Sequence, residues 1–195
     1  IGKVWMVEQL AHKPFPSGRL THGLVHAIKD LKSKYEINKD DIDTIECCVP
    51  PGVYKLVARP IINNLTTNYS KLCAKFVGAS FMVNDHLDIE SFTEEKYLNN
   101  TETLNFAKKI IMIKNDKLNQ KVLTPQKFII TLSNKSKIEI NLDHVYGHPK
   151  APLSEREYLG KFSKCCLSST KKLNKNQVNG MIDFIFDLEN QENVT

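Results

Sequence analysis

Long apolar runs are missing from this sequence of 195 residues. A membrane-spanning helix needs about 20 consecutive apolar residues, and no stretch approaches that length, so the sequence excludes a membrane-spanning protein. A basic segment followed by a short apolar run, the mark of a secretory signal, is also missing, and we therefore expect a cytoplasmic protein. The chain is 41% hydrophobic and 25% charged, which is typical of a folded globular domain and argues against disorder.

Cysteine is sparse, and its arrangement disfavours both disulfide bonds and a zinc site. The five cysteines form two adjacent pairs and one single residue: Cys47–Cys48, Cys165–Cys166 and Cys73. An odd number without a secretory signal does not suit a disulfide framework, and adjacent cysteines lack the two-residue gap of zinc-binding pairs. His22 and His26 have the spacing of paired metal ligands on a helix, but no third ligand accompanies them. We expect reduced thiols and no bound metal.

Acidic residues are fewer than basic ones: 22 Asp and Glu stand against 27 Lys and Arg, which leaves a net charge of +5. The lysines are nevertheless interleaved with Asp and Glu and form no long basic block. The aromatic residues near them show no pattern of a base-stacking surface. Nucleic acid is therefore not an expected partner, and we expect the lysines to form a solvated surface.

Apolar periodicity predicts an α+β fold, a mixed sheet with helices packed on it, rather than a regular alternation of strands and helices. Alternating or β-branched runs predict strands at residues 4–12, 42–49, 110–113, 127–132 and 137–142. Three-to-four spacing predicts helices at residues 18–35, 67–82, 101–108 and 175–189, and residues 154–157 match a capping box before a further helix. Residues 52–64 fit neither pattern clearly.

A loop containing Gly and Pro, Tyr146–Pro152, is the predicted boundary between two parts of the chain. We expect an α+β domain over residues 1–150 and a C-terminal helical extension over residues 151–195. The helices of this extension are amphipathic, and such helices need a partner surface that covers their apolar faces.

The most informative stretch is Lys13–His26, KPFPSGRLTHGLVH. Its two prolines hold the backbone extended before a helix that begins near residue 18. Lys13, Arg19 and His22 are thereby brought close to a helix N-terminus, where unpaired N–H groups and the helix dipole favour an anion. The stretch is suited to holding a carboxylate.

The same stretch resembles the entry into the second domain of the MmgE/PrpD family, which includes 2-methylcitrate dehydratase, cis-aconitate decarboxylase and iminodisuccinate epimerase. The resemblance rests on a Lys followed by Pro, an aromatic residue, Pro, two small residues, Arg, an apolar residue and Thr-His. Later landmarks follow in the expected order: Tyr69-Ser70, Gly147-His148-Pro149, Pro152-Leu153-Ser154 and Lys161-Phe162. Together these motifs cover nearly the whole chain.

The resemblance implies a cofactor-independent lyase or isomerase that acts on a small di- or tricarboxylate. It implies an active-site lysine at Lys13. We expect Lys13 and His22 to transfer protons, while Arg19 and His148 bind carboxylates of the substrate. It also implies a helical first domain that these 195 residues do not include. We therefore expect a part of a longer or split enzyme that is inactive alone, and a homo-oligomer.

Each of these four residues also fits a structural role. Lys13 fits a surface lysine at a strand end, and Arg19 an exposed arginine at a helix start. His22 fits a hydrogen-bonded histidine beneath a site. For the loop around His148, a structural turn is the plain alternative, because Gly and Pro favour turns.

Two positions depart from the pattern of the family. Members that resemble cis-aconitate decarboxylase carry an active-site His five residues after the lysine, where this sequence has Gly18. A helix tyrosine is replaced by Cys73, a residue type more typical of a small core position. These departures argue against a decarboxylase and leave the reaction type open. The alternative hypothesis is a non-catalytic carboxylate-binding or scaffold module that retains the fold.

Overall fold

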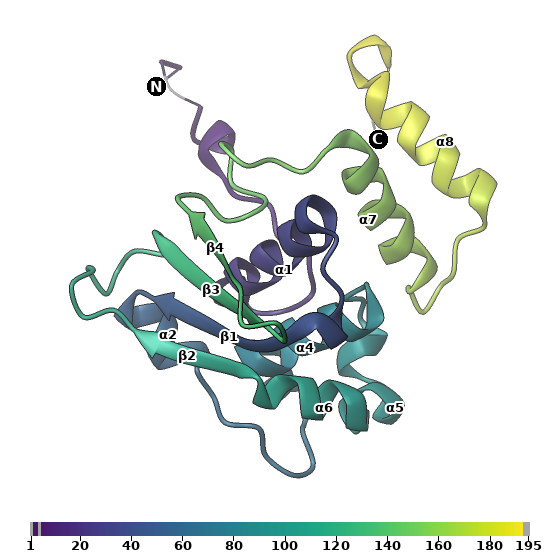
Figure 1. Cartoon of the computed structure of the whole chain (residues 1–195). Helices are drawn as coiled ribbons and strands as arrows, with labels where there is room; N and C mark the ends of the chain where they lie inside the picture. The colour runs from purple at the N-terminus through teal and green to yellow at the C-terminus, as the bar shows by residue number, and fades with distance from the viewer. Residues whose placement is uncertain (1, 4, 193–195) are drawn as a thin grey trace. The chain divides into compact units, whose positions relative to one another are not determined.

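The computed structural model describes residues 2–3 and 5–192 and divides into two compact units, Ile1–Pro152 and Leu153–Thr195. The first unit contains a four-stranded sheet in the order β2-β1-β3-β4 (Figure 1). Its strands are β1 (Ile42–Val49), β2 (Ile110–Lys114), β3 (Gln126–Leu132) and β4 (Lys137–Leu142). β1 pairs parallel with β2 and antiparallel with β3, which pairs antiparallel with β4. The predicted mixed sheet and α+β class are confirmed.

The helices of the first unit come mainly before β2 in the sequence. They are α1 (His22–Tyr35), α2 (Pro51–Val57), α3 (Thr67–Lys71), α4 (Ala74–Asn84), α5 (Glu95–Leu98) and α6 (Thr101–Lys108). Short 3-10 turns lie at Met6–Gln9, Arg19–Thr21, Lys39–Asp41 and Glu90–Phe92. A parallel pair of strands requires a crossover connection, and α2 to α6 supply it between β1 and β2.

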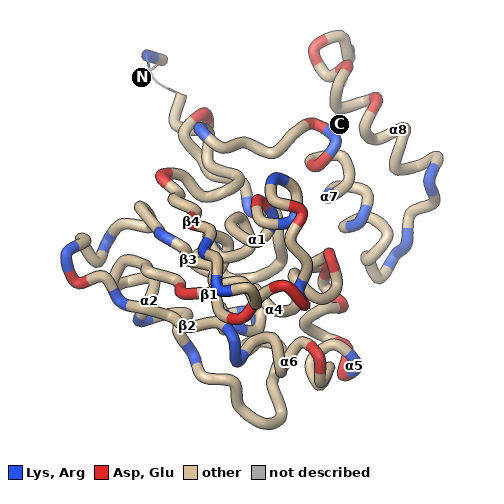
Figure 2. Tube along the Cα trace, in the orientation of Figure 1, with Lys and Arg blue, Asp and Glu red and all other residues tan. Residues whose placement is uncertain are grey.

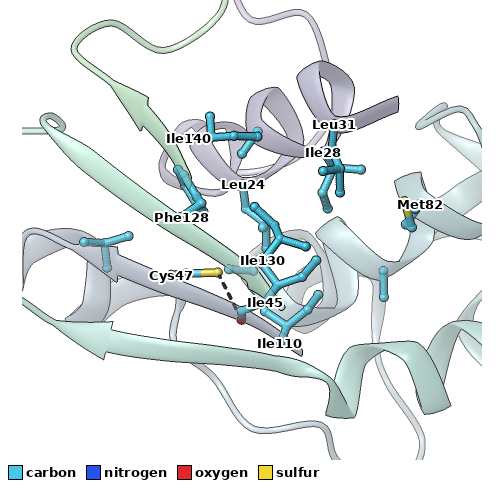
Figure 3. Close-up of a cluster of buried hydrophobic side chains, with 14 of the residues drawn as sticks. Leu24, Ile28, Leu31, Ile45, Cys47, Met82, Ile110, Phe128, Ile130 and Ile140 are labelled. Carbon is cyan, nitrogen blue, oxygen red and sulfur yellow. Dashed lines mark hydrogen bonds between the residues drawn. The ribbon is translucent and has the colours of Figure 1, made fainter. Parts of the chain in front are cut away.

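The main core lies between α1 and one face of the sheet. The spacing of Leu24, Ile28 and Leu31 places them on one stripe of α1, and all three are buried against the sheet (Figure 3). From the sheet, alternate residues such as Ile45 and Ile130 face them. These two patterns, with periods of 3.6 and 2 residues, are the ones from which the helix and strands were predicted.

A second cluster of buried side chains forms around α4. It consists of Val25, Leu65, Cys73, Phe76, Val77, Leu87, Phe92 and Leu98. α4 also packs against α1, and the absence of a side chain at Gly78 permits this approach, because a Cβ there would lie 2.5 Å from Cδ2 of Leu24. α1 is therefore held from two sides, which fixes the position of the residues at its N-terminus.

The predicted strand over residues 4–12 is wrong for the described residues, while Val4 lies outside them. Met6–Gln9 form a 3-10 turn, and the side chains of Trp5 and Val7 are 64% and 67% exposed. An alternating apolar pattern makes a strand only where a partner strand is available, and the described sheet consists of β1 to β4 without this segment.

The predicted helix over residues 67–82 is two helices, α3 and α4, which are separated at Leu72 and Cys73. Cys73 has extended backbone angles and forms the N-cap of α4. The break coincides with a tertiary contact, since the carbonyl of Lys71 accepts a hydrogen bond from the backbone N–H of Gly18 at 2.8 Å. Residues 52–64, which had no clear prediction, include most of α2.

The second unit contains two helices, α7 (Glu155–Leu167) and α8 (Lys175–Phe186), which contact each other, and a 3-10 turn at Leu188–Asn190. The predicted capping box is confirmed: Ser154 caps α7 and Glu157 bonds back to the backbone N–H of Ser154 at 2.9 Å. Apolar side chains of α8 are exposed, Phe186 at 66%. Within residues 2–3 and 5–192, every helix is too short or too polar to cross a membrane.

Candidate functional site

Two motif segments that are far apart in the sequence lie side by side in the first unit. The backbone N–H of His12 donates to the carbonyl of Gly147 at 2.8 Å, which joins the segment before α1 to the loop after β4 (Figure 1). Gly147 has φ +88°, and a Cβ at this position would clash with the carbonyl oxygen of His12. Glycine is therefore required here both by its backbone conformation and by the close approach of the two segments.

The loop around Gly147 is closed by its own hydrogen bonds. The N–H of Gly147 donates to the carbonyl of Ala151 at 2.7 Å, and the N–H of His148 donates to the carbonyl of Val145 at 3.0 Å. His148 is half-buried, and its ring stacks on His144 with 4.5 Å between centroids. Partial loss of hydration lowers the pKa of His148, and the neighbouring His144 and Arg19 side chains lower it further.

Arg19 connects the start of α1 to this loop. Its guanidinium donates to the carbonyl of Tyr146 at 2.5 Å and to the carbonyl of Val145 at 3.1 Å. The same group lies 3.4 Å from Nδ1 of His22. Burial lowers the pKa of Arg19, but a guanidinium keeps its charge at neutral pH in proteins. The side chain predicted to bind a substrate carboxylate is thus directed at the loop.

His22, the predicted proton-transfer residue, is fully buried at the first turn of α1. Because an arginine can only donate, its position beside Nδ1 of His22 fits an imidazole that accepts at this atom. The ring of Phe15 meets the ring of His22 edge-on at 5.4 Å. Lys13 is exposed, two residues before Phe15. The structure thus places Lys13 at the surface and His22 in the interior, where His22 contacts Phe15.

The turn before α1 carries hydrogen-bonded hydroxyls, but no side chain of the described residues caps the N–H groups at the start of the helix. The hydroxyl of Thr21 donates to the carbonyl of Gly18 at 2.8 Å and lies 3.0 Å from the buried hydroxyl of Ser17. Gly18 is packed against the chain between α3 and α4, where a Cβ would lie 2.6 Å from Cδ2 of Leu72. Of the two positions that depart from the family pattern, Gly18 thus contacts the residues Lys71 and Leu72, which directly precede Cys73 in the sequence.

Cys73 does not resemble an activated thiol. Its Sγ is buried and donates to the carbonyl of Arg59 at 3.4 Å. Burial raises the pKa of Cys73, and that of Cys47 is raised for the same reason. A thiol that stays protonated in an apolar cluster is a packing residue, as Cys73 is in the cluster around α4.

His26 contacts the same loop residue as Arg19, Tyr146, but was not among the predicted site residues. Its Nδ1 accepts a hydrogen bond from the backbone N–H of Tyr146 at 3.1 Å, and its Nε2 lies 4.0 Å from Oδ1 of Asp30. Lys29 lies 4.1 Å above the ring of Tyr146. No local pattern in the sequence marks this role, because the partner of His26 is a backbone N–H 120 residues away.

Positive charge dominates this group of residues. Arg19 and Lys29 face the Val145–Tyr146 segment, and three histidines, His22, His26 and His148, lie around it. The described residues contain no group of three or more His, Cys, Asp or Glu side chains arranged to hold a metal ion. The side chains that meet here, a guanidinium, an ammonium group and imidazoles, suit carboxylate binding and proton transfer.

A shallow pocket of about 370 Å³ lies elsewhere on the first unit, near the C-terminal ends of α1 and α4. Its charged lining combines Lys32 and Lys39 with Asp40, Asp41 and Asp85. Both lysines are engaged in ion pairs with carboxylates of the protein. Since three aspartates line it, this pocket is poorly suited to a polycarboxylate. We therefore place the candidate site where Arg19, His22 and His26 meet the loop that carries His148. Figure 2 shows the basic residues interspersed with acidic ones along the chain.

Comparison with known protein families gives one match. A family model described as the MmgE/PrpD C-terminal domain matches residues 15–181. The matched range includes Arg19, His22, His26 and His148, and it continues into α8, while Lys13 precedes it. No curated protein matches this chain.

Proposed function

The chain belongs to the MmgE/PrpD family through the C-terminal domain of that family, and we propose that it forms part of a cofactor-independent lyase or isomerase acting on a small di- or tricarboxylate. A dehydratase similar to 2-methylcitrate dehydratase is the preferred reaction class. The observation that carries this proposal is the meeting of the Lys13–His22 and Val145–His148 segments, which brings one guanidinium and several imidazoles together.

The chemistry of such a reaction needs two kinds of group. A base must remove a proton beside a carboxylate, and fixed positive charge must stabilise the electrons that remain. In this proposal Lys13 is the proton-transfer group at the surface of the domain. Arg19 and His148 provide positive charge and hydrogen-bond donors for carboxylates, and His22 supports proton transfer from beneath.

The proposal requires a second surface opposite the cluster. Lys13 is exposed, and a reaction that depends on proton transfer needs water to be restricted at the reacting atoms. We propose that the helical first domain of the family covers this surface, on the same chain or on a separate one, and that the active protein is a homo-oligomer. The isolated 195 residues are then expected to be inactive.

The test is turnover by the protein combined with a helical first domain of the family. 2-Methylcitrate, citrate, cis-aconitate and iminodisuccinate would be offered in parallel. Lys13→Ala is expected to lower kcat/KM by a factor of about 10² to 10⁴, the typical contribution of a general acid or base. Lys55→Ala, which removes another exposed lysine, is the matched control and should leave kcat/KM unchanged. Equal turnover by both variants would remove Lys13 from the mechanism.

A second candidate is a carboxylate-binding or scaffold module without catalysis. The occurrence of Gly18 and Cys73, where related enzymes have residues able to transfer protons, favours it. Under this alternative, the combined protein binds citrate with a saturable isotherm yet turns over none of the four substrates. Turnover that is lost with Lys13 decides in favour of the enzyme.

A further inference from the structure

The backbone of Tyr146 is held at both its N–H and its carbonyl by side chains from one continuous segment, the 3-10 turn Arg19–Thr21 and α1. Its N–H donates to Nδ1 of His26 at 3.1 Å, and its carbonyl accepts from Arg19 at 2.5 Å. Its ring lies under the ammonium group of Lys29 and packs 5.8 Å from the ring of His26. Tyr146 precedes Gly147 and His148, so these contacts set the position of the loop that carries His148.

Helix geometry explains why these side chains act together. Arg19 lies one 3-10 turn of three residues before His22, and His26 lies about one α-helical turn after it, so Arg19 and His26 are on one side of this segment. This segment thus presents a donor and an acceptor at the spacing of the carbonyl and the N–H of a single residue, Tyr146. Their order matches the polarity of the bonds, since arginine only donates and an unprotonated imidazole nitrogen accepts.

The bond to Tyr146 requires one particular state of His26. Because the backbone N–H can only donate, Nδ1 must be unprotonated, and the hydrogen of a neutral ring lies on Nε2, toward Asp30. A protonated ring would direct N–H against N–H. Arg19, Lys29 and Lys34 oppose protonation, while Asp30 favours it.

The phenol ring of Tyr146 is the titratable group that faces His26 from the loop. Burial is the largest cause of the lowered pKa of His26, ahead of all these charges. The environment and the hydrogen bond therefore favour the same neutral state.

We infer that His26 and Arg19 are positioning residues that fix the backbone of Tyr146, and through it the His148 loop, and that protonation of His26 releases this loop. The role in catalysis rests on the proposed function, because a misplaced His148 would matter only if it contacts a carboxylate substrate. The hold on the loop itself is a property of the 195-residue chain.

Hydrogen exchange at the Tyr146 amide, followed by NMR on the full chain, tests the hold directly. His26→Ala is expected to speed exchange of this amide at pH 7.5 by about fivefold to tenfold, the loss of one typical hydrogen bond. His26→Asn keeps an acceptor oxygen at the place of Nδ1 but does not titrate, so its exchange should stay near the wild-type rate. His86→Asn is the matched control, since Nδ1 of His86 contacts the backbone carbonyl of Asn84 elsewhere in the unit.

The pH dependence separates a positioning role from simple packing. As the pH falls below the ordinary value of a histidine, the exchange rate of wild type divided by that of His26→Asn should rise by up to tenfold per pH unit. Division by the variant removes the pH dependence of the exchange chemistry. In His26→Ala, the ring of His148 should titrate closer to its ordinary value than in wild type, and His26→Asn should restore the wild-type titration.

Two results would overturn the inference. One is Tyr146 exchange in His26→Ala that equals the wild-type rate. The other is a wild-type to His26→Asn ratio that stays constant while the His26 ring itself titrates. Both readouts come from the chain without substrate, so they remain informative even if the combined protein proves to have no enzymatic activity. If His26→Ala proves unfolded, the pH dependence of the ratio of the wild-type to the His26→Asn exchange rate still tests the inference.

Discussion

Replacement of Arg19 by methionine tests whether this guanidinium holds the loop after β4. Methionine keeps an unbranched, though shorter, side chain and has no donor for the carbonyls of Tyr146 and Val145, which Arg19 reaches at 2.5 and 3.1 Å. A hydrogen bond to a charged group contributes about 1.5–3 kcal/mol. Because Arg19 is only half-buried and the freed carbonyls regain water, we expect the lower end, a total loss of about 2–3 kcal/mol.

Urea unfolding of the 195-residue chain at 25 °C measures this loss. With an m-value of about 2 kcal/mol/M, the midpoint should fall by about 1–1.5 M. Arg19→Lys keeps the charge but offers a compact ammonium in place of a two-pronged donor, so its free energy of unfolding should lie between those of wild type and Arg19→Met. Arg156→Met, at an exposed position in α7, is the control and should change the free energy by less than about 0.5 kcal/mol.

A free energy of unfolding for Arg19→Met within 0.5 kcal/mol of wild type would refute this reasoning. The guanidinium would then contribute nothing measurable to the loop, and its contacts would have to be interpreted as those of a side chain that can exchange the carbonyls for a substrate. Arg19 was predicted from the sequence as a substrate ligand, and this measurement shows how much of its interaction energy is already used inside the protein.

Three further outcomes follow from the same contacts. Gly147→Ala should destabilise the chain by about 2–4 kcal/mol in urea unfolding, because φ is +88° and the new Cβ meets a backbone carbonyl. As the control, Gly160→Ala in a helix, where a Cβ meets open space, should stabilise the chain by up to about 1 kcal/mol. The pKa of His26 is lowered in the folded chain, so neutral His26 contributes stability that is fully present above about pH 6.5 and declines as the pH falls toward the lowered value. Urea midpoints should therefore fall between pH 7.5 and 5.5, and they should fall less in His26→Asn. Equal pH dependence of the midpoints in both proteins would contradict this. The exposed apolar face of α8 should cause self-association of the isolated chain, seen by light scattering, and Ile185→Asp should reduce it; monodisperse monomer in the wild type would refute the expectation.

The sequence predicted most of the sheet and most of the helices, because their apolar residues follow the periods of the elements closely. β1, α6 and the β3–β4 pair needed no tertiary information. The segment of residues 4–12 has a strand pattern, but a strand depends on a neighbouring strand that no local pattern reveals. The break at Cys73 likewise coincides with a tertiary contact, the hydrogen bond from Gly18 to the carbonyl of Lys71, and these residues are more than 50 positions apart in the sequence.

The candidate site was predictable in part. Its chemistry was visible in the residue types of the Lys13–His22 stretch and in the Gly147–His148 motif, and the fold brings these two together. The sequence did not reveal that Arg19 would be directed at main-chain carbonyls, since loop carbonyls have no signature of their own. His26 was considered only as a metal ligand, because its actual partner is a backbone N–H of a residue 120 positions away.

The central claim is that the meeting of these two segments forms a site for a carboxylate-bearing metabolite, and an NMR titration of the chain with citrate tests it most directly. Sodium chloride at matched ionic strength is the reference. Citrate is expected to cause saturable shifts that are concentrated in residues 13–22 and 144–148, with weaker binding in Lys13→Ala. Shifts that do not saturate, or that gather at the Lys32 and Lys39 pocket instead, would contradict it.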